Sequence, residues 1–260
     1  MPQTQVCQRF SASDSDVTIR SSDNFLFKVH RKNLAMLSEG FPGEDLPTYN
    51  EIVPLSESSA TLELLFQFMY PQPLPDLEDL PFTNLEQLAE AAEKYSVYAA
   101  MAVCKIYMRR VVGLEPLAVL SYAVKHGYQN IADEAAPLTL QEPRKDALRK
   151  LGAATFITWT LYHGMWTDVL LEAHRKPRVP MLHPGAAETC QCWYPFYEKV
   201  ISTLGNATGL LTFGALIDHN NPLLYTCSGT IHCIKRADLW RNNITAKIDA
   251  IPKFSNIKQD

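Results

Sequence analysis

The hydrophobic pattern changes its period near Ser58, and this change constrains the fold more than any other feature of the sequence. Before it, residues 16–20 alternate between polar and apolar, and residues 24–30 are rich in aromatic and branched side chains. Both segments predict short strands joined by a tight turn. After it, apolar residues recur every three or four positions, which predicts helices. The chain therefore begins as an α+β unit.

The neighbouring segments complete this unit. Residues 31–38 predict a short helix, and residues 51–55 predict a third strand, which Pro54 restricts to an edge or terminal position because proline cannot donate to a ladder. A helix should follow with Ser58 or Ser59 as its cap, then a loop with four prolines between residues 71 and 81. Two further helices are expected, one capped by Asn84 with Gln87 at the capping-box position, the other over residues 99–112.

This order of elements, with its particular residues, resembles the BTB/POZ fold. The matching residues are Asp16-Val-Thr-Ile19, Phe27-Lys-Val-His30-Arg31, Leu34, Ser38, Phe41, Val53-Pro-Leu55, Leu65-Phe-Gln-Phe-Met-Tyr70, Leu88-Ala-Glu-Ala-Ala-Glu-Lys-Tyr95 and Val97. The resemblance predicts an α+β fold, in which a BTB/POZ domain at residues 13–112, a short β-sheet flanked by helices, precedes a mainly helical region at residues 113–258. The proline-rich loop looks most like the fungal branch of the family.

The resemblance implies protein association. BTB/POZ proteins pair through this domain, or act as adaptors that hand a substrate to a cullin-type ubiquitin ligase. Asp16 and Arg31 stand where family members build a charged pocket at the dimer groove; otherwise they are a turn residue and a solvated charge at a helix start. Residues 42–47, the proline-rich loop and the short arm before Asp16 depart from the family pattern, so cullin binding and strong dimerisation both stay open.

No arrangement of side chains predicts catalysis. His30 lies at the end of an apolar strand, where a histidine is usually a hydrogen-bonded structural residue, and no nucleophile or acid accompanies it in a recognisable pattern. We therefore expect a protein that is not an enzyme and that needs no catalytic cofactor.

The second half reads as helices. Gly113 and Pro116 mark its start, and apolar residues recur at helical spacing from there to Pro137. Residues 145–176 predict one long helix with a break near Gly152 or Gly164, and no internal repeat is visible. This half is expected to position the first domain.

Four cysteines within residues 190–233 carry the sharpest chemical signal: Cys190, Cys192, Cys227 and Cys233. Zinc prefers four thiolate or imidazole ligands in a tetrahedron, and these two pairs could supply them. The alternative is that all four are buried as small apolar side chains. A second hypothesis is therefore an oligomerisation domain fused to a structural zinc module.

Composition and charge argue against several other classes of protein. With 24 Lys and Arg against 28 Asp and Glu, neither half has the basic face that phosphate backbones require, so we expect no nucleic-acid partner. The uncharged runs are broken by polar residues and glycines, so no membrane span is expected, and nothing at the N-terminus resembles a secretion signal. The expected location is intracellular, in cytoplasm or nucleus. A role as a transcriptional co-regulator is a third, weaker hypothesis.

Overall fold

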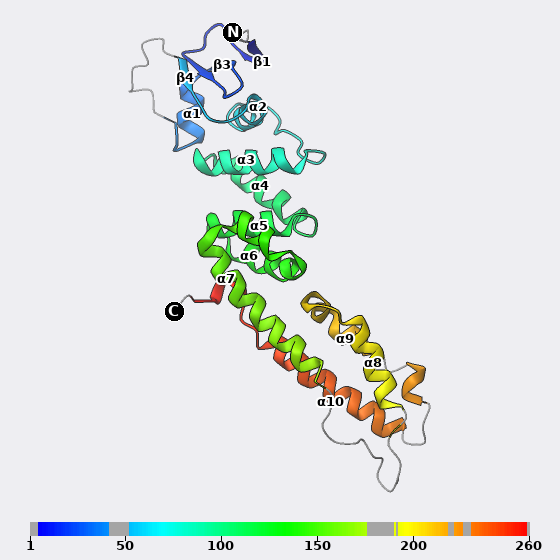
Figure 1. The fold of residues 1–260 in the computed structure, drawn as a ribbon. Coiled ribbons are helices and arrows are strands. Elements are labelled where there is room, and N and C mark those ends of the chain that lie inside the picture. The colour runs from blue at the N-terminus through cyan, green and yellow to red at the C-terminus, as the bar shows by residue number, and fades with distance from the viewer. Residues whose placement is uncertain are drawn as a thin grey trace. The chain divides into compact units, whose positions relative to one another are not determined.

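The computed structural model describes residues 5–41, 52–175, 190, 192–217, 221–225 and 230–258. The chain divides into two compact units, Met1–Val111 and Val112–Asp260. The first holds a small sheet with helices and the second is mostly helical, which confirms the predicted α+β class (Figure 1).

The sheet of the first unit has four strands in the order β1-β3-β2-β4. β2 and β3 pair antiparallel, as predicted, through a turn in which Asn24 adopts a positive φ of 67°. β4 lies at the edge, parallel to β2, which confirms the place inferred from Pro54. The strands are β1 (Gln5–Ser11), β2 (Val17–Arg20), β3 (Phe25–Val29) and β4 (Ile52–Pro54).

Strand β1 was not predicted. It pairs parallel to β3, and its register shifts between Val6 and Ser11. The shift places Cys7 and Phe10, three residues apart, on the buried side. A strand with a buried residue every third position shows no alternation of period two, so the usual signal is lost. Phe10 nevertheless fixes β1 to its own chain, because its ring lies 5.6 Å from that of Phe66 and 5.3 Å from that of Tyr70.

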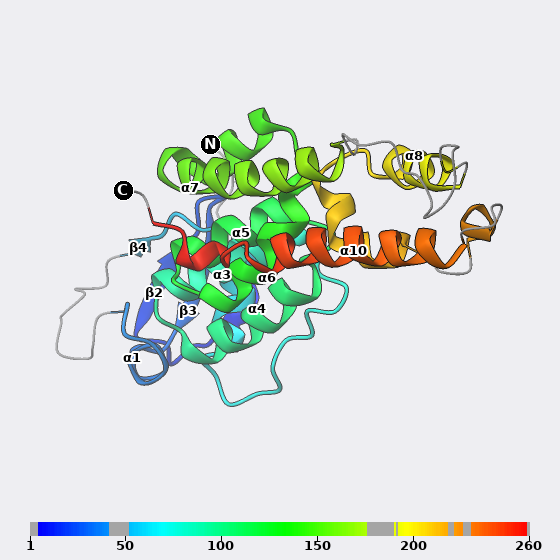
Figure 2. The same ribbon diagram turned by 90° about the horizontal axis from the view of Figure 1, so that it is seen from below.

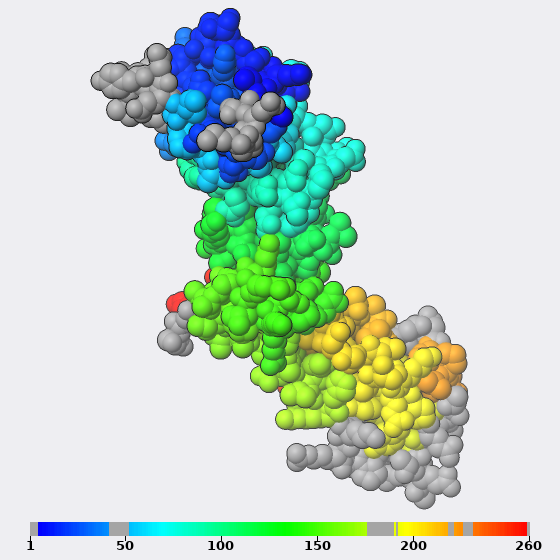
Figure 3. Space-filling view, turned by 45° about the horizontal axis from the view of Figure 1, so that its top comes forward, coloured from blue at the N-terminus to red at the C-terminus, as the bar shows by residue number. Residues whose placement is uncertain are grey.

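Among the described residues of the first unit, four helices accompany the strands, and Figure 3 shows these residues from blue to blue-green in a space-filling view. Helix α2 begins after Ser58, whose side chain accepts a hydrogen bond from the backbone of Thr61, as expected of the cap. The core between α2 and the sheet is aromatic, with the Phe27 and Phe66 rings 5.5 Å apart and both fully buried. The helices are α1 (Arg31–Leu37), α2 (Ser59–Gln67), α3 (Phe82–Lys94) and α4 (Tyr98–Arg110).

The cap predicted for α3 is wrong. The helix starts three residues earlier, after Pro81, and Asn84 lies inside its first turn. Pro81 takes the cap position instead. Its φ of −54° and ψ of 140° are non-helical, as at a cap, and its carbonyl accepts a hydrogen bond from the Asn84 backbone N–H. Gln87 instead accepts a hydrogen bond from the Thr61 hydroxyl of α2. A side chain expected to act locally therefore links two helices.

Glu57 joins the end of the sheet to α3. Its side chain is 12% exposed; one oxygen accepts a hydrogen bond from Lys94 and the other from the Tyr95 hydroxyl, both at 2.7 Å. Burial alone would raise the pKa of the Glu57 carboxyl, but the hydrogen bonds from Lys94 and Tyr95 outweigh it and lower that pKa. The ionised form therefore stabilises the fold.

We expect Glu57→Gln to lower the free energy of unfolding by about 1 kcal/mol at neutral pH, since half-exposed Lys94 weakens the loss. A depressed carboxyl pKa gives stability that is full above the unfolded pKa and disappears as pH falls through the folded one. The difference between wild type and variant should therefore close below about pH 4. Urea unfolding at both pH values measures it. Glu63→Gln, at an exposed ion pair with Arg9, is the control and should change little; a gap that persists in acid would contradict the assignment.

The second unit starts with two helices where the pattern suggested one continuous face. α5 (Pro116–Lys125) and α6 (Gln129–Ala135) are separated at residues 126–128, and η1 (Ala136–Gln141) follows. α7 (Arg144–Ala173) is the long helix that was predicted, broken at Gly152 and continuous through Gly164. Gly152 has φ 72° and ψ 167°, a conformation essentially restricted to glycine.

The remainder of the second unit returns along α7. α10 runs beside α7, and the following η4 also contacts it (Figures 1 and 2). The Asp133 carboxylate of α6 holds this last segment by accepting hydrogen bonds from the backbone and hydroxyl of Ser255. The elements are α8 (Trp193–Thr203), η2 (Ala207–Thr212), α9 (Phe213–Leu216), η3 (Pro222–Tyr225), α10 (Thr230–Asp249) and η4 (Phe254–Asn256). Among the helices that the structure describes, none has the length and apolar character to cross a membrane.

Candidate functional site

The structure brings Asp16 and Arg31 together where β3 meets α1. The Asp16 carboxylate accepts a hydrogen bond of 2.8 Å from the Arg31 backbone N–H, so it caps α1 from a distant point in the sequence. Asp16 is exposed, whereas Arg31 is 9% exposed. Arg31 is thus not the solvated charge of the alternative interpretation. Their role in a partner interface stays a prediction.

His30 lies in a hydrogen-bonded network at the same junction. The Tyr70 hydroxyl accepts a bond of 2.9 Å from the His30 backbone N–H and lies 3.0 Å from Nδ1 of the ring. Nε2 lies 3.3 Å from the Asp14 carboxylate. Burial is the main reason that the pKa of the Tyr70 hydroxyl is raised. Tyr70, at the end of α2, therefore fixes the β3–α1 junction, as expected of a structural histidine and its partner.

The outer side of α1 exposes two large apolar side chains as well as Lys32. Met36 is 68% exposed and Leu37 is 40% exposed, while Leu34 is buried and holds the helix to the unit. A seven-residue helix that exposes two large apolar side chains next to the Asp16–Arg31 junction offers both apolar contact and charge to another surface. We refer to Asp16, Arg31, Met36 and Leu37 as the α1 surface.

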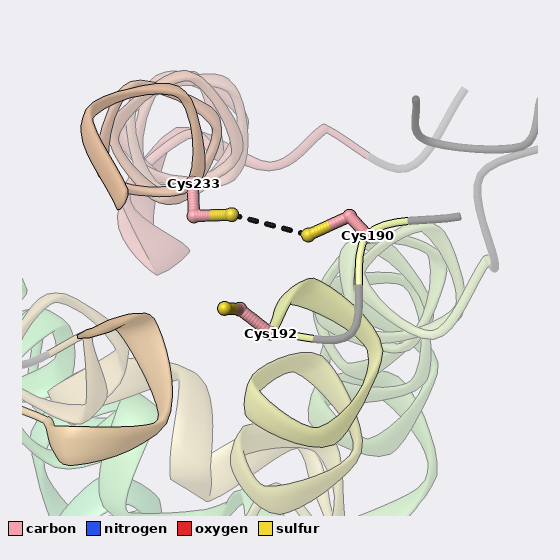
Figure 4. A group of neighbouring side chains, drawn as sticks. All are labelled: Cys190, Cys192 and Cys233. Carbon is pink, nitrogen blue, oxygen red and sulfur yellow. Dashed lines mark hydrogen bonds between the residues drawn. The ribbon is translucent and has the colours of Figure 1, made fainter. Parts of the chain in front are cut away.

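A second candidate site lies in the other unit, where three of the four predicted cysteines meet. Cys190 and Cys192 precede α8, and Cys233 lies in the first turn of α10 (Figure 4). Their sulfur atoms all lie within 4.8 Å of one another, and the Cys190 and Cys233 sulfurs are 3.2 Å apart. All three residues are buried, and none of them forms a disulfide. Cys227 lies outside the described residues, so its part in the site stays a prediction.

Aromatic side chains of α8 and α10 pack against one another close to this cysteine cluster. The Trp193 backbone N–H donates to the Cys190 sulfur at 3.4 Å. The Trp193 and Tyr197 rings of α8 face Trp240 of α10, with ring centroids 6.0 Å and 5.1 Å away. Sequence reasoning found these cysteines by their pairing but missed α10, which positions Cys233. The apolar residues of α10 give only a weak helical stripe, so the signal was faint.

Comparison with known families decides the nature of the first unit. The family model described as BTB/POZ domain matches residues 7–111. These residues form a BTB/POZ domain. Its four-stranded sheet and four helices carry the α1 surface, and the helical second unit lies outside the match. A search of curated proteins gave no match for the chain. The BTB/POZ domain makes the N-terminal unit a protein–protein interaction module.

Proposed function

We propose that this protein is a non-catalytic interaction protein whose BTB/POZ domain joins two copies of the chain through the α1 surface. The observation that carries the proposal is the exposure of Met36 and Leu37 beside the buried Arg31 and its partner Asp16. Interfaces gain most of their energy from a few side chains near the centre, and Met36 and Leu37 are exposed apolar side chains that a second copy could bury.

Strand β1 supports self-association of folded domains over strand exchange. Family members with an obligate dimer exchange their first strand, but here β1 pairs with β3 of its own chain and Phe10 is buried in its own core. A surface contact between two folded domains therefore fits this chain better. Such contacts are weaker than exchanged strands and respond strongly to a single substitution.

We expect Met36→Glu to weaken the dimer of the full chain about 30-fold, because a buried charge at an apolar contact costs about 2 kcal/mol. Sedimentation equilibrium over a concentration series measures the dissociation constant. Ile106→Glu on α4 is the matched control, since Ile106 is 61% exposed, and it should leave the constant unchanged. A wild-type chain that stays monomeric, or an equal effect of both variants, would refute self-association through this surface.

A cullin is the second proposed partner, in an adaptor role for a ubiquitin ligase. The loop between α2 and α3, which borders the cullin side in family members, exposes Leu74 to 55%. Passing the same samples over an immobilised cullin amino-terminal domain tests the idea. Retention of wild type and of Met36→Glu would support a cullin contact that is independent of self-association. Loss of retention for both would leave no support for an adaptor role. The fungal type and the cellular location stay predictions.

A further inference from the structure

We propose that Cys190, Cys192 and Cys233 bind one zinc ion, which fastens the start of α8 to the start of α10. This site is independent of the BTB/POZ domain and of its partner. Three observations on the described residues carry the inference: the spacing of the sulfurs, their burial, and the helix ends that face them.

The spacing of the sulfurs fits a tetrahedral metal. With zinc–sulfur bonds of about 2.3 Å, tetrahedral angles place two ligand sulfurs roughly 3.8 Å apart. The Cys190 and Cys233 sulfurs lie 3.2 Å apart and all three sulfurs lie within 4.8 Å of one another, which is compatible with this value. A disulfide would need about 2.05 Å, so the closest pair is not bonded. Small side-chain adjustments would equalise the three distances around an ion.

Burial separates this cluster from ordinary free cysteines. Cys190 is 3% exposed, and Cys192 and Cys233 are fully buried. Cysteines that only fill apolar space need not be grouped, yet Cys233 lies beside Cys190, which is 43 residues earlier in the sequence, and beside its neighbour Cys192. A zinc ion bound by the three thiolates would account for this grouping. A water or another donor would then take the fourth position of the tetrahedron.

A helix start places a backbone donor beside one of these sulfurs. Zinc binds the deprotonated sulfur, and the N-terminus of a helix carries partial positive charge that stabilises an anion. The N–H of Trp193, first residue of the eleven-residue α8, points at the Cys190 sulfur. Cys233 lies in the first turn of the twenty-residue α10. Backbone donors of this kind orient metal ligands and tune their charge.

The metal would also explain how two helix starts are held together. α8 and α10 also meet through the rings of Trp193, Tyr197 and Trp240. The rings provide apolar contact area, whereas the ion would join the segment that leads into α8 to the first turn of α10. Because the ligands come from separate segments, metal binding and folding of this region should be coupled.

The test uses the full chain purified under reductant. Metal analysis should find about one zinc per chain, and cobalt(II) should replace zinc with the absorption of a tetrahedral thiolate complex. Cys233→Ser should lower the bound zinc about tenfold or more after dialysis. Cys104→Ser is the matched control, since Cys104 is fully buried on α4 of the other unit, and it should keep the zinc of wild type.

The cobalt(II) spectrum of wild type keeps the proposal testable if Cys233→Ser fails to fold. A reduced wild-type chain without zinc and without a thiolate–cobalt band would overturn the proposal. So would equal zinc in Cys233→Ser and Cys104→Ser. Mass spectrometry after alkylation distinguishes the redox alternative: a disulfide between Cys190 and Cys233 in metal-free protein would also overturn it. Dimerisation of the BTB/POZ domain should be unaffected in every case.

Discussion

Trp159→Ala should destabilise the second unit by about 3 to 5 kcal/mol, the largest effect expected of a single substitution in this chain. Trp159 is fully buried on α7 and stacks against Phe156 with ring centroids 5.6 Å apart. Its indole N–H donates to the Thr139 hydroxyl at 2.7 Å, and Thr139 is also fully buried. Truncation therefore removes a large apolar contact, leaves a cavity and breaks a buried hydrogen bond.

Two further variants separate these causes. Thr139→Val keeps the shape but leaves the indole N–H of Trp159 without its acceptor, which should cost about 1 to 3 kcal/mol. Leu161→Ala lies on the same helix at a position that is 45% exposed, and it should change stability by no more than about 0.5 kcal/mol. Urea unfolding, with hydrogen exchange to resolve the units, gives the three values. A Trp159→Ala cost no larger than that of Leu161→Ala would show that this core is not what stabilises the unit.

Gly40→Ala is expected to destabilise the BTB/POZ domain by about 3 kcal/mol. A Cβ at Gly40 would lie 2.5 Å from the Cα of Tyr95 and 2.9 Å from its carbonyl carbon and oxygen. Because these are backbone atoms at the end of α3, no side-chain rotation relieves the clash, and the chain itself must move. The movement would also break the 3.0 Å hydrogen bond from the Gly40 N–H to the Tyr95 carbonyl.

The matched control for this variant is Gly164→Ala. Gly164 lies inside α7, and an added Cβ would meet nothing within 4 Å. Alanine is the better helix former, so this change should stabilise the second unit by about 0.5 to 1 kcal/mol. Thermal unfolding together with hydrogen exchange assigns each effect to its unit. Equal and small effects of the two variants would mean that the close approach of Gly40 to Tyr95 is not required.

Local sequence patterns explain why much of the BTB/POZ domain was predictable. Strand β2 alternates between polar and apolar residues, β3 is rich in aromatic and branched residues, and α2 follows a serine cap with apolar residues at helical spacing. These signals depend on residues only a few positions apart, so they can be read along the chain. The charged pair Asp16 and Arg31 was singled out by resemblance; the structure places the two residues together at the β3–α1 junction, and their role in a partner interface stays a prediction.

The sequence by itself determined the change from strands to helices, the edge position of β4, and the cysteine pairs that could meet. Only the tertiary structure decided that β1 joins the sheet, that α7 breaks at Gly152, and that Cys233 reaches Cys190. The reason is the range of the interactions. Periodicity and capping act within one or two turns, whereas strand pairing and the meeting of distant sulfurs depend on how whole elements pack, and no local pattern encodes that packing.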